Sequence, residues 1–417
     1  MLTDKTYSEI YQDLFIAYLE TRKTKYHSKA HISFMTNLED NLHYLSSSLL
    51  HRTYVPDPAL RFTCDVPVKR EIFTSSFAHR VVCRLVYDYL VPVFDPTFIY
   101  DSYSCRVGKG TLVGIERLEH NLRSCTANFQ KPCYILKCDL SGYFMSIDKR
   151  ILSIELFNGL ARRIDAKDIS GRTFRETLDM ELLEYLLDVI VWRNPLDGCK
   201  VVGTWEDFAD LPNNKSLVYS PPGVGLAIGD ITSQFFSNLY LNVLDQFVKR
   251  ELKCRWYGRY VDDFYICHPD REYLVYLRAL VKNYLEDRLH LTLNMNKTYI
   301  TSADRGVNFL GAYVTPFRRY ACNRTVRAFH QKICILESLC EKNPSIDTFY
   351  YVRSVLNSYL GYFSHFKAFN IVEQTMRKSS LGRYFDYTPD YHKAEFKSRE
   401  LTEEELLDTL YSRKRNF

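Results

Sequence analysis

The chain has 417 residues, of which 46% are hydrophobic and 25% charged. This composition is typical of a globular protein and not of a disordered one, and the length suffices for about two to four subdomains. The formal net charge of +5 is too small to predict a nucleic-acid ligand by itself.

The N-terminus indicates no targeting segment. It carries Asp4, Lys5 and Glu9 and has no apolar signal core. No stretch approaches the roughly 18 consecutive apolar residues of a membrane-spanning helix. Twelve cysteines are scattered without the C-x-x-C spacing of metal sites. We therefore expect a cytoplasmic protein with reduced cysteines and no membrane partner.

Apolar spacing predicts the elements of the first half of the chain. Helices are expected over 5–50 and 76–93, with an extended segment at 60–73 between them. The segment CYILKCDL (133–140) is typical of a buried strand, and it ends in a carboxylate, Asp139. The next elements expected are two helices near 148–163 and 175–192 and a loop-rich stretch over 193–228.

The second half continues this alternation of helices and strands. A strongly amphipathic helix is predicted at 231–252, then a β-hairpin, and a helix at 270–289. Further predicted elements are a strand at 307–314, helices at 323–341 and 345–378, and a charged tail with a capping box formed by Thr402 and Glu405. This order predicts an α+β fold with a mostly antiparallel sheet.

The predicted hairpin, GRYVDDFYIC (258–267), carries Asp262 and Asp263 at its tip. Aspartates are common in tight turns, so an ordinary turn is one interpretation. A metal site is the other, because adjacent carboxylates repel unless a cation lies between them. If the strand ending at Asp139 lies beside the hairpin, three carboxylates meet and could hold two Mg²⁺ ions. The sequence leaves three unrelated surface acids open.

Several motifs, in this order, resemble those of reverse transcriptases over roughly residues 8–370. They are VPVKREIFTSSFAHRVVCRLV (66–86), KCDLSGYFMSI (137–147), YVDD (260–263), LNMNKT (293–298) and VNFLG (307–311). The resemblance implies a right-hand polymerase with fingers, palm and thumb. It places fingers with an N-terminal helical extension at 1–132, a palm with an antiparallel sheet and helices at 133–315, a helical thumb at 316–380 and the charged tail at 381–417.

The resemblance also implies roles for individual residues. Asp139, Asp262 and Asp263 would be catalytic and would bind two Mg²⁺ ions, or Mn²⁺ as a substitute, together with the backbone of Leu140. The implied nucleotide-binding residues are Lys69, Arg70, Arg80, Phe144, Ile228, Gly229 and Lys297, with Phe144 as the gate that excludes a 2′-hydroxyl. Structural roles stay open for most of these: a salt bridge for Arg80, core for Phe144 and Ile228, a loop glycine for Gly229, and a surface lysine for Lys297.

A basic run marks the predicted thumb. No acidic residue occurs from Arg305 to Leu336. Lysine and arginine contact nucleic-acid phosphates whatever the base sequence. The nucleic-acid-binding residues predicted here are Arg318, Arg319, Arg324 and Arg327.

The segment IGDITSQ (228–234) resembles, more narrowly, the reverse transcriptases of diversity-generating retroelements, a bacterial and phage group related to group II intron enzymes. Most reverse transcriptases have Gln-Gly and Ser-Pro where this chain has Ile228-Gly229 and Ser233-Gln234. Ala227 and Asp230 depart from the subfamily's usual Pro and Asn.

This narrower resemblance implies error-prone copying of a template-repeat RNA, mutated at adenines, in a bacterial or phage-infected cytoplasm. The partners it implies are template RNA, cDNA or primer, deoxynucleoside triphosphates and a small basic accessory protein, with oligomerisation left open. A phage-defence reverse transcriptase and a catalytically idle RNA-binding scaffold are the alternatives.

Overall fold

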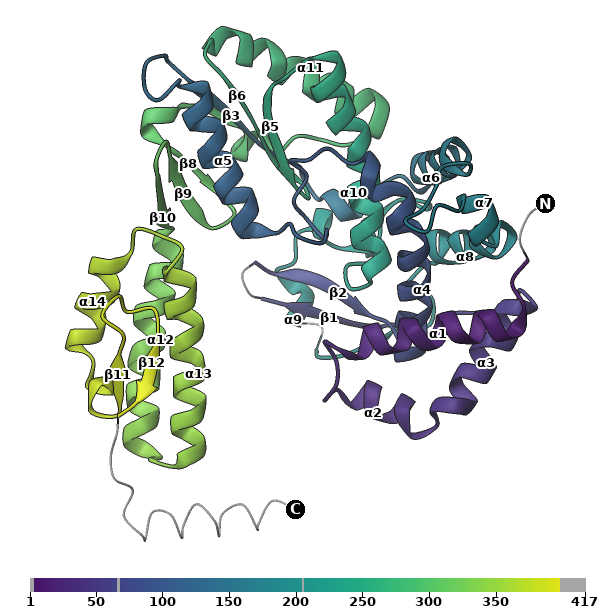
Figure 1. Ribbon diagram of the computed structural model, residues 1–417, viewed down its shortest axis with the longest axis horizontal. Helices are drawn as coiled ribbons and strands as arrows, with labels where there is room; N and C mark the ends of the chain where they lie inside the picture. Colours follow the sequence, from purple (N-terminus) through teal and green to yellow (C-terminus); the bar gives the residue numbers. More distant parts are fainter. Residues whose placement is uncertain (1–3, 66–67, 205, 398–417) are drawn as a thin grey trace. The chain divides into compact units, whose positions relative to one another are not determined.

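The computed structural model describes residues 4–65, 68–204 and 206–397, which form two compact units (Figure 1). The larger unit comprises Met1–Gly114 and Tyr134–Ile300. The smaller unit comprises Ile115–Cys133 and Thr301–Phe417. In the described part of the chain, no helix is both long and apolar enough to cross a bilayer.

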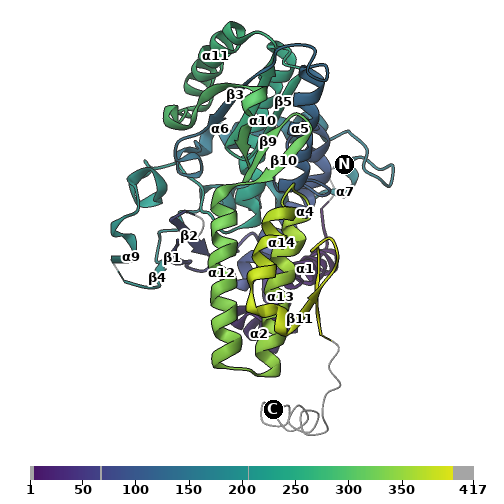
Figure 2. The same ribbon diagram turned by 90° about the vertical axis from the view of Figure 1, so that its left-hand side faces the viewer.

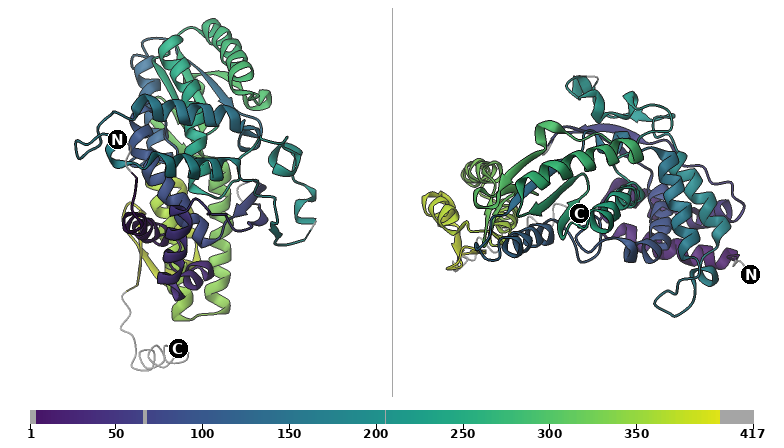
Figure 3. Two further views of the ribbon diagram at one scale, coloured as in Figure 1. Left: turned by 90° about the vertical axis from the view of Figure 1, so that its right-hand side faces the viewer. Right: turned by 90° about the horizontal axis from the view of Figure 1, so that it is seen from above.

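The larger unit begins with helices whose starts are fixed by capping side chains. The predicted helical region 5–50 forms α1 (Tyr7–Arg22), α2 (Lys29–Thr36) and α3 (Leu38–Leu50). Thr6 and Glu9 form a capping box at α1, and the Ser76 side chain caps α4 (Phe77–Phe94). α1 packs on α3 and α4, as the views in Figure 3 show. The predicted helix at 76–93 is confirmed.

The extended segment forms a hairpin. β1 (Leu60–Cys64) pairs antiparallel with β2 (Arg70–Thr74), and β4 (Lys200–Val201) adds to β1 in parallel. The fully buried Glu71 carboxylate anchors the hairpin: it accepts hydrogen bonds from Arg61 Nε at 2.7 Å, Ser216 Oγ at 3.0 Å and the Leu217 N–H at 2.7 Å. These contacts tie the loop-rich segment after residue 200 to the hairpin.

The predicted strand at 133–140 and the predicted hairpin form one sheet with a fourth strand that was not predicted, β7, in the order β5-β6-β3-β7. The strands are β3 (Tyr134–Asp139), β5 (Trp256–Tyr260), β6 (Asp263–His268) and β7 (Tyr299–Ser302). β6 is antiparallel to both β3 and β5. Their register places the carboxyl end of β3 beside the start of β6.

Helices support this sheet. α11 (Arg271–Leu289) packs on β3 and β6, and α10 (Ile231–Gln246) contacts α4, α11 and α6 (Lys149–Arg163). The larger unit also contains the helices α7 (Phe174–Thr177), α8 (Met180–Trp192) and α9 (Glu206–Ala209). The predicted helix at 231–252 changes to a π-helix at Phe247–Glu251. One continuous apolar core runs from Ile10 to Leu293, so the first helices and the sheet share it.

The smaller unit contains α5 (Thr111–Cys125), a three-stranded sheet and a helical part (Figure 2). The single strand predicted at 307–314 is two strands, β8 (Val307–Phe309) and β9 (Ala312–Thr315), followed by β10 (Arg318–Ala321). Leu310 and Gly311 form the turn between them with positive φ angles of 52° and 83°. α12 (Asn323–Lys342) packs against α13 (Ile346–Phe363), and α14 (Phe369–Lys378) follows.

The prediction of a charged tail from residue 381 is wrong for its first part. β11 (Phe385–Tyr387) and β12 (Ala394–Phe396) form a hairpin that packs on α13. Leu381, Phe385 and Ala394 are buried in the core of the smaller unit. The predicted capping box of Thr402 and Glu405 lies outside the described residues.

Candidate active site

The three aspartates of the predicted metal site converge in the larger unit. Asp139 is the last residue of β3, and Asp263, the first residue of β6, lies directly opposite it in the antiparallel register. Asp262 belongs to the two-residue turn between β5 and β6. Like charges placed opposite each other across two strands destabilise a sheet. The three aspartates therefore form one cluster, and the alternative of three unrelated surface acids is wrong.

The turn that carries Asp262 is strained. Val261 has a φ of 53°, in the left-handed region that a β-branched side chain rarely adopts. Such a conformation costs about 1–3 kcal/mol and persists only where the surroundings impose it. Here Arg259 Nη1 donates a hydrogen bond of 3.1 Å to the Val261 carbonyl.

A buried ion pair fixes that arginine. Arg259 and Asp245, on β5 and α10, are both fully buried. Arg259 Nε donates to Asp245 Oδ1 at 2.7 Å and Nη2 to Oδ2 at 2.6 Å, and Tyr257 Oη donates to Oδ1 at 2.6 Å. Burial alone would lower the pKa of the guanidinium, but the Asp245 carboxylate raises it above its ordinary value. The arginine is therefore a permanent cation next to the turn that carries Asp262.

Two lysines and an asparagine contact the aspartates. Lys137, on β3, forms an ion pair with Asp263, and Lys297 Nζ donates to both oxygens of Asp139 at 3.1 and 3.2 Å. The Asn294 N–H donates to the Asp139 carbonyl at 2.8 Å, and its side-chain amide donates to Oδ1 at 3.3 Å. These cations offset part of the repulsion among the carboxylates.

The ionised form of Asp262 is disfavoured by its surroundings. Burial raises the pKa of its carboxyl above the ordinary value, and the neighbouring Asp139 carboxylate raises it further. Arg70 and Lys297 act in the opposite direction, so both lie close enough for their charges to be felt at Asp262. Burial also disfavours the charged form of Lys137 and lowers its pKa to about 8, although the Asp139 carboxylate acts to raise it.

This arrangement fits divalent metal ions. The converging donors are carboxylate oxygens, which Mg²⁺ prefers, and a cation would relieve the repulsion that raises the Asp262 pKa. Leu140 follows Asp139 directly and forms an isolated bridge with Leu293. Its side chain is buried in the core, so the backbone is the part of Leu140 available to a metal.

Phe144, the predicted gate, and Ile228 both pack against apolar residues of the larger unit. Phe144 lies in a short 3-10 helix, Tyr143–Ser146, half-buried against the core, and its carbonyl accepts the Leu226 N–H at 2.8 Å. Ile228 is half-buried in a small apolar cluster with Phe73, and its carbonyl accepts the Phe73 N–H at 2.9 Å. Both side chains thus have structural contacts beside any role toward a nucleotide.

Gly229 has a packing reason to be glycine. A Cβ at this position would lie 1.9 Å from the Phe73 carbonyl oxygen on β2, a distance that no side chain tolerates. The close approach that requires a glycine is therefore to strand β2.

The predicted phosphate-binding cations lie on β2 and α4. Lys69 precedes β2 and is half-buried, whereas Arg70, its first residue, is exposed. Arg80 is half-buried on α4, and its charge is felt at Asp230. Of these three cations, Arg70 is the one whose charge lowers the pKa of Asp262, in the cluster with Asp139 and Asp263.

The predicted thumb arginines are not equivalent. Arg319 pairs with Glu116 and Glu119 of α5, at 2.9 Å in each case. Arg318, Arg324 and Arg327 are exposed. Within the smaller unit, Arg319 therefore joins β10 to α5, and the other three are open to a ligand.

Sequence reasoning missed the residues that support the aspartates. Lys137 could have been found, because residues two apart in a strand share a face and Asp139 lies two positions on. The Arg259–Asp245 pair gave no such signal, because its contact joins two different elements, β5 and α10. Asn294 lay within the LNMNKT motif but was given no role of its own.

Comparisons with known proteins bear on this site. Residues 69–314 match the family described as reverse transcriptase (RNA-dependent DNA polymerase). Protein YkfC of Escherichia coli (strain K12) is 24% identical over 329 residues, which cover 70% of this chain and 76% of that protein.

Two solved telomerase structures, both in complex with a TWJ fragment of telomeric RNA, are also similar. That from Candida albicans has a TM-score of 0.44 at 12% identity over 80% of this chain, and that from Candida tropicalis 0.40 at 11% over 79%. This chain spans 57% and 58% of the two telomerase chains. Because the family match covers more than half of its residues, the chain belongs to the reverse transcriptase family of RNA-dependent DNA polymerases.

Proposed function

We propose that this protein is an RNA-directed DNA polymerase that adds deoxynucleotides to a primer 3′-hydroxyl. The observation that carries the proposal is the placement of Asp139 opposite Asp263, with Asp262 in the adjoining turn. These carboxylates would hold two Mg²⁺ ions, or Mn²⁺, which activate the hydroxyl nucleophile and neutralise the pyrophosphate that leaves.

Residues of this chain would then position the nucleotide. Arg70, exposed and electrostatically coupled to Asp262, would bind the triphosphate together with Lys69 and Arg80. Phe144 would pack below the sugar and leave no room for a 2′-hydroxyl. Lys297 would release Asp139 when the carboxylate binds metal and would then face the phosphates.

The direct test is extension of a labelled primer on an RNA template by the full chain. We expect extension with deoxynucleoside triphosphates and Mg²⁺, little with ribonucleoside triphosphates, and none with chelator. Binding of the primed RNA without any extension, with Mg²⁺ or Mn²⁺, would favour the idle RNA-binding scaffold instead.

Exposed arginines on α12 are proposed to bind the duplex. Arg324→Ala combined with Arg327→Ala should weaken binding of every primer–template sequence alike. It should also reduce the slope of log affinity against log salt by roughly one unit for each phosphate that the variant no longer binds. Affinity measured across a salt series tests this.

Two further variants serve as controls for that measurement. Arg319→Ala should lower stability and leave the slope unchanged, because Arg319 already pairs with two glutamates. Lys342→Ala, at the other end of the same helix, should have no effect on either quantity. An unchanged slope in the double variant would mean that Arg324 and Arg327 do not contact phosphate.

We further propose that the protein makes mutated cDNA from a template-repeat RNA of a diversity-generating retroelement. The support is the IGDITSQ segment, in which aliphatic Ile228 stands where most reverse transcriptases have glutamine, and the same resemblance suggests a small basic accessory protein and a bacterial or phage-infected cytoplasm. A neighbouring template repeat and a near-identical variable repeat that differ at adenines would favour this role over phage defence.

Ile228→Gln tests the mutagenic part of this proposal. Glutamine is the family's usual residue here, and its amide can bond to polar groups beside the nucleotide, whereas isoleucine cannot. One hydrogen bond of roughly 1 kcal/mol changes a selectivity ratio about fivefold. We expect fewer errors opposite template adenine in particular, with extension retained, when cDNA from one RNA of all four bases is sequenced.

Ile228→Leu is the matched control, since it keeps an aliphatic side chain in the cluster with Phe73. Its error spectrum should equal that of the wild-type protein. Equal spectra for Ile228→Gln and wild type would leave Ile228 with a packing role alone.

A further inference from the structure

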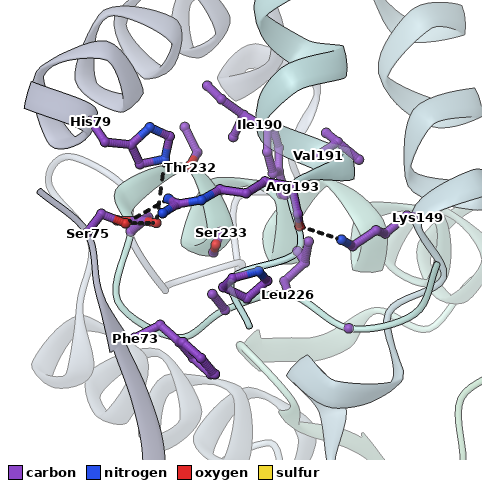
Figure 4. Close-up of a pocket in the computed structure, with 15 residues that line it drawn as sticks. Phe73, Ser75, His79, Lys149, Ile190, Val191, Arg193, Leu226, Thr232 and Ser233 are labelled. Atoms are coloured by element: carbon purple, nitrogen blue, oxygen red, sulfur yellow. Dashed lines mark hydrogen bonds and ion pairs between the residues drawn. The ribbon is translucent and has the colours of Figure 1, made fainter. Parts of the chain in front are cut away.

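A group of metal-binding side chains lies apart from the three catalytic aspartates. His79 and Cys83 stand one helical turn apart on α4, and Asp230 stands directly before α10. All three are buried, with exposed fractions of 1%, 1% and 7%. One ligand atom of each lies within 4.8 Å of the other two. Figure 4 shows His79 and Ser75 turned toward Arg193 next to the first turn of α10.

Asp230 does not act as an ordinary helix cap. An aspartate at this position usually accepts a hydrogen bond from the backbone of the first turn, but the Asp230 side chain makes none. Its Oδ2 instead accepts from Ser75 Oγ at 2.9 Å and lies 4.0 Å from His79 Nε2. Among the described residues Oδ1 has no hydrogen-bond partner, although it is buried. An unsatisfied buried carboxylate oxygen is costly, which points to a missing ligand.

The histidine is oriented for ligation through Nε2. Its Nδ1 is hydrogen-bonded to Tyr54 Oη at 2.8 Å, and its Nε2 lies 3.3 Å from Cys83 Sγ. Metal-binding histidines are commonly held in this way through their second nitrogen. Tetrahedral Zn²⁺, with bonds of about 2.0 Å to nitrogen and 2.3 Å to sulfur, places such atoms roughly 3.5 Å apart.

We propose that His79, Cys83 and Asp230 bind a Zn²⁺ ion that joins α4 to the start of α10. Nitrogen, sulfur and oxygen ligands together favour zinc over Mg²⁺. Binding releases the thiol proton to solvent, so the thiolate and the carboxylate match the charge of the ion. A cavity of about 20 Å³ lined by His79 and Asp230 has room for one water as a fourth ligand.

The site would act through the chain on Ile228 and Gly229, to which the proposed function assigns contacts with the nucleotide. Asp230 follows Gly229 and Ile228, and the Ile228 carbonyl is bonded to β2. A metal at Asp230 would fix the other end of this short segment. The competing arrangement is a metal-free hydrogen-bonded network, in which Arg80 and Arg193 balance the Asp230 charge.

The experiment uses the full chain, stripped with chelator, reloaded with Zn²⁺ or Co²⁺ and separated from free metal. We expect about one zinc per chain by mass spectrometry, a thiolate-to-Co²⁺ absorption band and a higher melting temperature with zinc. Cys83→Ala should lose the band and the zinc. Cys340→Ala, which removes a buried free cysteine of the smaller unit, should retain both.

A second variant distinguishes zinc binding at this site from metal binding at the three aspartates. In the Asp262→Ala, Asp263→Ala variant the band and the zinc should persist, because neither residue is a ligand here. The proposal is overturned if wild-type protein gives no thiolate band with Co²⁺, or if Cys83→Ala binds as much zinc as wild type. The cobalt spectrum of wild-type protein decides the matter even if Cys83→Ala does not fold.

Discussion

Replacing Asp262 and Asp263 together with alanine is expected to reduce primer extension by more than about 10³-fold, because losing even one group that stabilises transition-state charge costs 10²–10³. Binding of primed RNA should remain nearly unchanged, since the pair is proposed to hold metal ions and not the RNA. Extension and binding are measured on the same protein. An active variant would refute the polymerase proposal.

The single variant Asp262→Ala, which keeps the ion pair between Asp263 and Lys137, should be more stable than wild type without metal. The folded-state pKa of Asp262 is raised above its ordinary value, so its ionised form opposes folding. Wild-type stability should therefore fall as pH rises from the ordinary aspartate value through the raised pKa, and the alanine variant should lack this loss. Urea unfolding across this pH range, in chelator, measures the difference.

A matched control removes two carboxylates elsewhere in the larger unit, exposed Asp165 and partly exposed Asp168. Asp165 and Asp168 lie in the loop after α6, and their hydrogen bonds with Arg175 and Ser170 lower the pKa of each carboxyl. Replacing both with alanine should leave extension unchanged and should not stabilise the protein at neutral pH. A gain in stability there would mean that the effect at Asp262 comes from general charge reduction.

Asp245→Ala is expected to lower the free energy of unfolding by about 3–5 kcal/mol, the cost of leaving a buried charge without its partner. The Arg259 guanidinium, fully buried, would lose both charged hydrogen bonds to Asp245. Extension should also fall, because Arg259 would no longer hold the Val261 turn that carries Asp262. Chemical denaturation and primer extension test the two effects.

A double variant separates stability from positioning. Replacing the pair with apolar residues, as in Asp245→Leu with Arg259→Met, removes both buried charges and should recover much of the lost stability. It cannot restore the hydrogen bond to the Val261 carbonyl, so extension should stay low. Full activity in a stable double variant would show that the strained turn needs no arginine.

The sequence predicted most of the elements that build the candidate site. Strand β3 ends at Asp139, as the apolar run before it had indicated. The hairpin was predicted with Asp262 and Asp263 at its tip, whereas its turn is Val261 and Asp262, and Asp263 begins β6. The side chains that hold this geometry were not predicted. Asp245 and Arg259 look like ordinary residues of a helix and a strand until the fold brings them together, because a contact between distant segments has no local pattern.

The elements of the smaller unit that were predicted wrongly have local causes in the sequence. The apolar run 307–314 showed no polar turn, and only Gly311 marks the break between β8 and β9. The helix predicted at 345–378 ends at Phe363 although neither glycine nor proline follows directly. The hairpin near residue 390 was hidden by charged residues on its exposed positions, while Phe385 and Ala394 face the core.

The shared core of the larger unit has a consequence for synthesis on the ribosome. Ile10 and Leu293 belong to one apolar cluster, so the core of the larger unit cannot be completed until almost three hundred residues have been made. At about 5–20 residues per second, the delay is roughly 15–60 s. During that interval α1 to α4 can pack on one another, but α4 lacks α10, against which it packs in the folded protein. The nascent chain is therefore a natural client for chaperones that shield exposed apolar helices.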